Sequence, residues 1–223
     1  MLLSRVRHSF ELFSGPVVFK NKVSLRQYTV DTETKATIGD DDLFHRVDLR
    51  VGKILKVESH GEAGHLYIEQ GKLQLILLYL FLYLDLNMEP TETLPNPRTI
   101  VSGLAPYMPK ESLLNKYVVV VNNMKPSKFR GVLSQGMLLA AGKGDKVELL
   151  HPPSTSQLGE RVYLSKVNMG TADPVLKPKQ RVFEQVSQDL KTNGSRIATY
   201  KGHELLTSAG PVACESIVDG QIS

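Results

Sequence analysis

Residues 47–58 read V-D-L-R-V-G-K-I-L-K-V-E and alternate apolar with polar side chains almost strictly, which restricts the fold more than any other stretch. Successive side chains of a β-strand point to opposite faces, so this alternation predicts one long strand. Gly52 lies inside it, where a glycine is typical of a bulge or of the sharp bend of a barrel strand. The positions expected to face inward are Val47, Leu49, Val51 and Ile54.

Further short strands and one short helix are predicted up to residue 150. Residues 117–121, Y-V-V-V-V, are mostly β-branched, so this strand is expected to be buried on both faces or to lie in a barrel wall. Residues 109–116 suggest a helix, because Pro109 suits a first helical turn. Short strands with one helix before the fourth are typical of a five-stranded OB-type barrel, so the predicted class is mainly β. The remaining expected strands are 66–70, 98–104, 137–141 and 146–150.

From Pro152 onward the sequence predicts a small α+β extension. Residues 178–190 carry Val182, Val186 and Leu190 at helical spacing, which predicts one amphipathic helix. Two short strands are expected after it, at 197–200 and 205–207. The predicted organisation is a barrel over residues 43–151 and an extension over 152–223.

Residues 1–42 are predicted to form a basic leader and an acidic linker without fixed structure. Residues 1–29 contain five Lys or Arg and one acid, Glu11. Such a composition is typical of a mitochondrial presequence, but a disordered tail or a leader left by an imperfect gene model is the preferred interpretation. Residues 31–42 reverse the sign, with five acids against Lys35, and are interpreted as a linker.

Residues 73–84, L-Q-L-I-L-L-Y-L-F-L-Y-L, form an apolar run without amphipathic period. Such a helix would be about 18 Å long, too short for a hydrocarbon core of about 30 Å, so no membrane span is expected. We interpret the region near 71–87 as an insertion outside the fold core. Its opening Gly71-Lys72 is what a read-through splice donor would encode, so a retained intron over 71–84 is one hypothesis.

The charge balance weakly favours an anionic partner. The 223-residue chain has a net charge of +4 and a pI near 9.0, and residues 98–166 hold ten Lys or Arg against four Asp or Glu. The single cysteine, Cys214, excludes an internal disulfide and favours a reducing compartment. It is expected to be a small buried residue.

No catalytic or cofactor-binding motif is found, so a non-enzyme without cofactor or metal is expected. Residues 142–146, G-K-G-D-K, lack the phosphate-loop spacing, and Ser134 lies in G-V-L-S-Q-G, which is not a nucleophile elbow. His60, Glu62 and His65 lack a third ligand at a recognisable spacing, so a solvated turn is expected there.

A basic stretch over residues 123–137 reads N-M-K-P-S-K-F-R-G-V-L-S-Q-G-M and contains no acid. Pro126 biases the residue before it away from the helical region, so the cations are expected on an extended or turning backbone. Gly131 and Gly136 allow a positive φ or a close approach of the backbone to a ligand. A basic, aromatic-bearing loop suits a phosphate backbone, although an ordinary solvated hairpin explains the composition equally well.

These motifs together resemble the tRNA-binding domain of the endothelial-monocyte-activating polypeptide II family. The resemblance covers roughly residues 43–223 and includes the extension of eukaryotic members, which packs on the barrel where bacterial relatives dimerise. Gly61 and Gly64 replace the proline and aspartates usual in the family, and the apolar run has no family counterpart. The likeness rests on residues 46–54, 97–104, 123–137, 152–162 and 176–186, with 189–193 and 198–202.

The resemblance implies a non-catalytic tRNA-binding protein that serves an aminoacyl-tRNA synthetase or a multisynthetase complex. Two alternatives stay open: a detached C-terminal part of a tyrosyl-tRNA synthetase, and a cytokine-like extracellular signal. The implied protein is a cytoplasmic monomer with a pseudo-dimer interface, with a mitochondrial location as the alternative. Residues on the family's tRNA-binding motif are Asn123, Lys125, Lys128, Arg130, Ser134 and Met137, to which Lys53 and Arg98 are added on charge and position.

Overall fold

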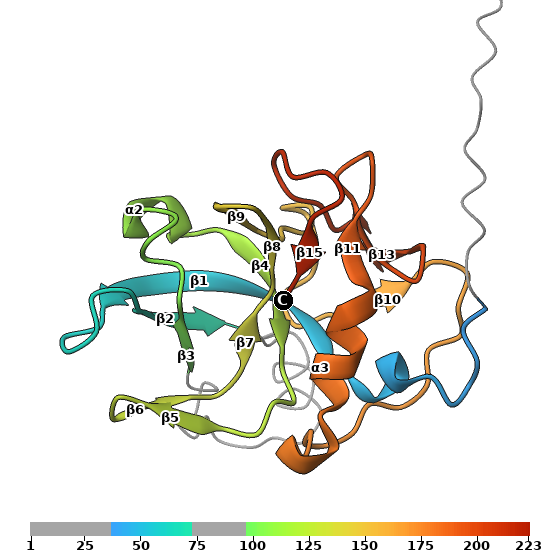
Figure 1. Ribbon diagram of the computed structural model, residues 1–223, viewed down its shortest axis with the longest axis horizontal. Coiled ribbons are helices and arrows are strands. Elements are labelled where there is room, and N and C mark those ends of the chain that lie inside the picture. Colours follow the sequence, from blue (N-terminus) through green and yellow to red (C-terminus); the bar gives the residue numbers. More distant parts are fainter. Residues whose placement is uncertain (1–36, 73–96) are drawn as a thin grey trace, which may run out of the picture. The chain divides into compact units, whose positions relative to one another are not determined.

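The computed structural model describes residues 37–72 and 97–223, which all belong to one compact unit (Figure 1). The basic leader and the whole apolar run lie outside the described residues. Only Gly71 and Lys72 of the supposed insertion are described, and they continue a strand that pairs with residues on both of its sides.

Five antiparallel strands form a nearly closed barrel in the order β3-β2-β1-β4-β7, and the mainly-β prediction is confirmed. A two-stranded hairpin, β5–β6, interrupts the chain between β4 and β7 (Figure 1). The barrel strands are β1 (Leu49–Ser59), β2 (Tyr67–Lys72), β3 (Arg98–Ser102), β4 (Tyr117–Val121) and β7 (Met137–Leu138), and the hairpin strands are β5 (Ser127–Phe129) and β6 (Val132–Ser134).

The bulge expected at Gly52 is found further along β1, between Ile54 and Lys56, while Gly52 itself pairs regularly with Val118. The extra residue changes the phase of the alternation, so that Ile54 and Val57 share the face that packs on the barrel interior. Without it the two side chains would lie on opposite faces.

Strand β4 is buried on both faces, as its valine run predicts. Val118 and Val120 pack into the barrel interior together with Ile54 of β1. Val119 and Val121 belong to a second core, in which residues of the extension cover the outside of the barrel. This second core holds Cys214, which is 3% exposed, as expected.

The extension shares a sheet with the chain that follows the barrel, in the order β10-β13-β12-β11-β15-β8-β9. The C-terminal strand β15 pairs with β8, so the end of the chain is hydrogen-bonded to the segment after β7. The strands are β8 (Ala140–Lys143), β9 (Lys146–Leu149), β10 (Tyr163–Leu164), β11 (Leu190–Thr192), β12 (Ala198–Tyr200), β13 (His203–Thr207), β14 (Gly210–Pro211), which pairs with β13, and β15 (Gln221–Ile222).

The single helix predicted over 178–190 is wrong. Arg181 has φ +47°, which interrupts the helical path and separates η2 (Pro178–Gln180) from α3 (Val182–Val186). Val182 and Val186 are buried as expected, whereas the third position of the pattern, Leu190, begins a strand after η3 (Ser187–Asp189). In the barrel, α2 (Lys110–Leu113) confirms a short helix capped by Pro109.

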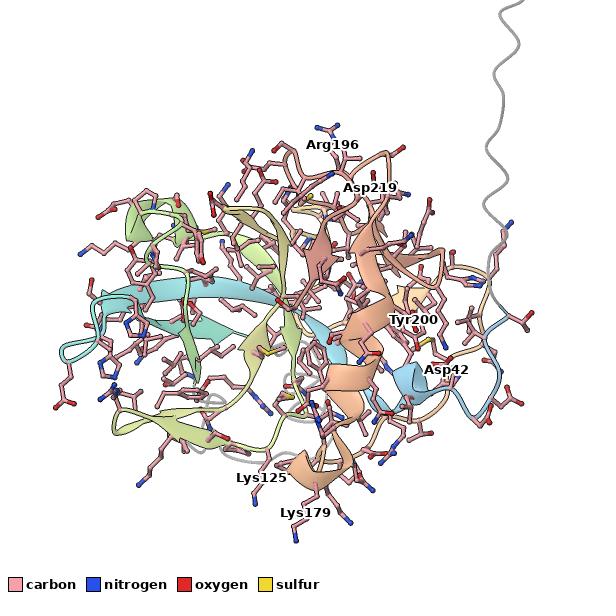
Figure 2. The ribbon with its side chains drawn as sticks, in the orientation of Figure 1. Asp42, Lys125, Lys179, Arg196, Tyr200 and Asp219 are labelled. Atoms are coloured by element: carbon pink, nitrogen blue, oxygen red, sulfur yellow. The ribbon has the colours of Figure 1, made fainter. Side chains whose placement is uncertain are left out.

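The acidic linker ends earlier than predicted, because Asp42 is anchored. Its carboxylate accepts hydrogen bonds from the Phe44 amide at 2.9 Å, the Tyr200 hydroxyl at 2.8 Å and the Lys201 ammonium at 2.7 Å. Figure 2 shows Asp42 and Tyr200 side by side. This contact fixes η1 (Leu43–Arg46) at the entry to the barrel.

Candidate nucleic-acid interface

The basic stretch folds into the β5–β6 hairpin, whose two-residue loop is Arg130-Gly131. Phe129 pairs with Val132, and the loop residues have φ of +47° and +89°. Positive φ at both loop positions is the pattern of a type I′ turn, which matches the twist of the flanking strands. Gly131 meets this requirement without strain, whereas Arg130 holds a conformation that costs a non-glycine residue about 1–2 kcal/mol.

The cations of this hairpin are exposed and available to a ligand. Lys125, Lys128 and Arg130 are all exposed, and none of them forms an ion pair with a described residue. Lys128 lies opposite Leu133, so these two share a face, while Arg130 belongs to the turn. Phe129 is 47% exposed beside them.

Asn123 is a buried connection between the barrel and the extension. It is 4% exposed, and its Oδ1 accepts the Asp48 amide at 3.1 Å. Its Nδ2 donates to the carbonyl oxygens of Arg46 at 2.9 Å and Asp173 at 2.8 Å. The side chain therefore has its hydrogen bonds satisfied within the protein and positions the start of the hairpin.

Ser134 and Met137 fasten the other end of the hairpin. The Ser134 hydroxyl is buried, accepts the Val101 amide at 3.0 Å and donates to the Gly136 carbonyl at 3.1 Å. Met137 pairs with Val121 and packs on the core shared with the extension. A Cβ on Gly136 would lie 3.1 Å from the Val121 oxygen, so the close approach predicted for this glycine is to the barrel wall.

Arg98 holds the two ends of the hairpin segment together. One guanidinium nitrogen donates to the Asn122 carbonyl at 2.9 Å and to the Gln135 carbonyl at 3.1 Å. Asn122 precedes the hairpin and Gln135 follows it, so this arginine closes the loop at its base. Lys53 lies on β1 with its ammonium 5.6 Å from the centre of the Tyr117 ring, a cation–π contact.

A groove of about 470 Å³ opens beside Arg98, between the barrel and residues 169–174. Its other two arginines share one carboxylate: Arg50 Nε donates to Asp48 at 2.7 Å, and Arg161 Nε lies 4.0 Å from the same oxygen. Burial lowers the pKa of the Arg161 guanidinium. The groove is thus a junction whose arginines are partly compensated, unlike the cations of the hairpin.

Sequence reasoning missed His60, which was expected in a solvated turn. It is 6% exposed, and its Nδ1 accepts the Glu62 amide at 3.2 Å. The neutral ring then carries its proton on Nε2, which lies 3.4 Å from the Phe129 carbonyl and donates to it. His60 therefore stabilises the hairpin through its hydrogen bond to Phe129. No local sequence pattern indicates this contact.

Glu69 is a second residue without a sequence signal. It is 1% exposed in the barrel, and only one of its oxygens has a partner among the described residues, the Ser102 hydroxyl. Burial raises the pKa of this carboxyl to about 7.

Within the described ranges no cluster of three or more His, Cys, Asp or Glu could hold a metal ion. No helix there is long and apolar enough to cross a membrane.

An OB-type barrel that carries an exposed, acid-free basic hairpin defines a nucleic-acid-binding domain. The family model of a putative tRNA binding domain matches residues 84–161. The matched segment of the chain belongs to this domain family.

Relatives extend the similarity through the C-terminal extension. The chain is 39% identical over 193 residues to the cytoplasmic tyrosine–tRNA ligase of Danio rerio, covering 85% of this chain and 33% of the relative. It is 39% identical over 157 residues to aminoacyl tRNA synthase complex-interacting multifunctional protein 1 of Mus musculus, covering 70% of this chain and 44% of the relative. It thus spans less than half of either protein.

The C-terminal domain of Plasmodium vivax p43 has a similar structure, with a TM-score of 0.68 and 29% identity. The similarity covers 81% of this chain and 98% of that domain, so the barrel and the extension are both included. The comparisons favour neither the detached-ligase nor the cytokine interpretation over a tRNA-binding role linked to synthetases.

Proposed function

We propose that this protein binds tRNA without catalysing a reaction, and that it serves aminoacyl-tRNA synthetases in the cytoplasm. The observation that carries this proposal is that Lys125, Lys128 and Arg130 are exposed and have no ion-pair partner within residues 37–72 and 97–223, in a segment fixed at both ends. The support for synthetase partners and for a cytoplasmic location is the names of the relatives.

The predicted site residues divide into two roles in this mechanism. Lys125, Lys128 and Arg130 neutralise phosphates of the RNA backbone, and Phe129 offers an exposed ring to a base. The remaining motif residues hold the hairpin in the conformation that presents these groups. These positioning residues are Asn123, Ser134, Met137 and Arg98. Lys53, on the barrel wall, is a candidate for a separate and weaker backbone contact.

We further propose a monomer in which the extension occupies the place of a second subunit. Val119 and Val121 form an apolar strip on the outside of the barrel, and the extension of the same chain covers it. An uncovered strip of this kind would favour association with another copy. The pseudo-dimer interface is therefore satisfied within one chain.

The proposal is tested by titrating mixed tRNA into the full chain over a range of salt concentrations. Each phosphate contact contributes about 0.7–0.9 to the slope of log affinity against log salt. We expect Lys128→Gln with Arg130→Asn to lower affinity roughly 10- to 100-fold and to reduce the slope by about 1.5. The asparagine is chosen because it tolerates a positive φ.

The matched control neutralises two exposed cations elsewhere, Lys110→Gln on α2 with Lys191→Gln on β11, and should leave both quantities nearly unchanged. Salt-independent binding by the unmodified chain, or equal losses in the two double variants, would contradict the proposed function.

A further inference from the structure

The extension carries a basic segment of its own directly before α3. Residues 177–181 read K-P-K-Q-R, and Lys177, Lys179 and Arg181 are all exposed. None of the three forms an ion pair with a described residue. No acidic residue occurs between Asp173 and Glu184, so the segment is as free of negative charge as the hairpin.

The fold places this segment against the start of the hairpin. The Leu176 amide donates to the Asn123 carbonyl at 2.8 Å, and Met124 and Leu176 form a parallel β-bridge. Leu176 is buried in the core shared by the barrel and the extension, which fixes the position of the bridge. The two basic segments, separated by some fifty residues of sequence, therefore begin side by side.

The two basic segments have the same residue pattern after the β-bridge: an apolar residue, a lysine and a proline. Lys125 follows Met124 and precedes Pro126, while Lys177 follows Leu176 and precedes Pro178. Because the bridge is parallel, the two lysines leave it in the same direction. A following proline disfavours the helical region for both, and Lys177 is extended at φ −78° and ψ 123°. In Figure 2, Lys125 and Lys179 project from the same edge of the molecule.

Arg181 repeats a second feature of the hairpin. Its φ of +47° equals that of Arg130, and both are non-glycine residues in the left-handed region. Such a residue costs about 1–2 kcal/mol relative to a relaxed backbone.

We propose that Lys177, Lys179 and Arg181 join Lys125, Lys128 and Arg130 in one cationic surface, along which the sugar–phosphate backbone of an RNA lies. The inference rests on the proposed function and deepens it. The extension then has two roles: it covers the apolar outside of the barrel, and it contributes about half of the phosphate contacts.

The test compares two variants of the full chain in the same salt titration with tRNA. The extension variant carries Lys177→Gln, Lys179→Gln and Arg181→Asn, and the hairpin variant carries Lys128→Gln and Arg130→Asn. We expect the extension variant to lose affinity roughly 10-fold or more and its salt slope to fall by about 2. The double variant of Lys110 and Lys191 serves again as the control.

The outcomes separate the two proposals. An unchanged salt slope in the extension variant, together with a reduced slope in the hairpin variant, would overturn the shared surface and leave the tRNA-binding function standing. No tRNA binding by the unmodified chain would remove both.

A second measurement does not depend on the folding of a variant. Photo-crosslinking of the unmodified chain to tRNA should label peptides from both 123–131 and 176–181. Labelling restricted to the hairpin peptide would refute the shared surface.

Discussion

Strand β4 and the β5–β6 hairpin are neighbours in sequence and opposites in burial. Val118 to Val121 are at most 2% exposed, whereas every residue of β5 is exposed and Phe129 reaches 47%. The wall is held by apolar packing on two faces, and the hairpin by a few hydrogen bonds at its base. Under the proposed function, stability and ligand binding are therefore assigned to adjacent segments, which meet at Asn123.

The variant Asn123→Asp is expected to have the largest effect, and it tests whether Asn123 connects the two segments. The substitution keeps the shape of the side chain but turns the nitrogen that donates to Arg46 and Asp173 into an oxygen facing their carbonyls. We expect the free energy of unfolding to fall by about 3 kcal/mol or more, measured by urea denaturation. Asn168→Asp makes the same change at an exposed position and should alter stability by less than about 0.5 kcal/mol. Equal effects would mean that Asn123 does not join the two segments.

The barrel also contains a buried titratable carboxyl, that of Glu69 on β2. The variant Glu69→Gln tests how its protonation affects stability. The folded pKa of Glu69 is about 7 against an ordinary 4.5, so the folded state binds more protons between these values. The stability that Glu69 contributes is therefore complete below pH 4.5 and is lost as the pH rises to about 7.

Relative to the Gln variant, the wild-type protein should lose about 3 kcal/mol of unfolding free energy over this range. Denaturant unfolding of both proteins from pH 4.5 to 8 measures the difference. Glu62→Gln, at an exposed position of the turn before β2, should show no such dependence. A difference between wild type and Glu69→Gln that is flat with pH would indicate that the carboxyl is solvated.

The smallest effect on stability is expected in the hairpin itself. Arg130→Gly relieves the strain at φ +47° but makes the unfolded chain more flexible, so stability should change by less than about 1 kcal/mol. The affinity for tRNA should fall about 5- to 10-fold, because one charged contact is lost. Arg130→Lys keeps the charge and should retain more of the affinity. A large loss of stability in the glycine variant would show that the hairpin contributes to the wall.

Much of the barrel could be predicted from local patterns. The alternation over residues 47–58 and the valine run 117–121 mark β1 and β4 because side-chain direction repeats every two residues in a strand. The basic stretch was correctly expected to be non-helical. The helix predicted over 178–190 failed, because a turn at Arg181 is decided by tertiary packing and not by the spacing of three apolar residues.

The sequence did not show which residues of the candidate site are exposed cations and which are buried residues that hold the hairpin. Asn123 and Ser134 lie in the same motif as Lys128, and no local property distinguishes a buried amide from an exposed cation there. Their partners are Asp48, Asp173 and Val101, which are remote in sequence. His60 and Glu69 became notable only through burial.

The sequence by itself determined the strands, the acid-free basic segments and the glycine at the second position of the hairpin loop, because side-chain periodicity and allowed φ values are local properties. Tertiary structure alone decided that the bulge follows Ile54 and that Glu69 is buried. It also decided that the segments starting at Lys125 and Lys177 leave the same β-bridge. These outcomes depend on strand register and on the burial of one segment by another, which are set by the packing of the whole chain.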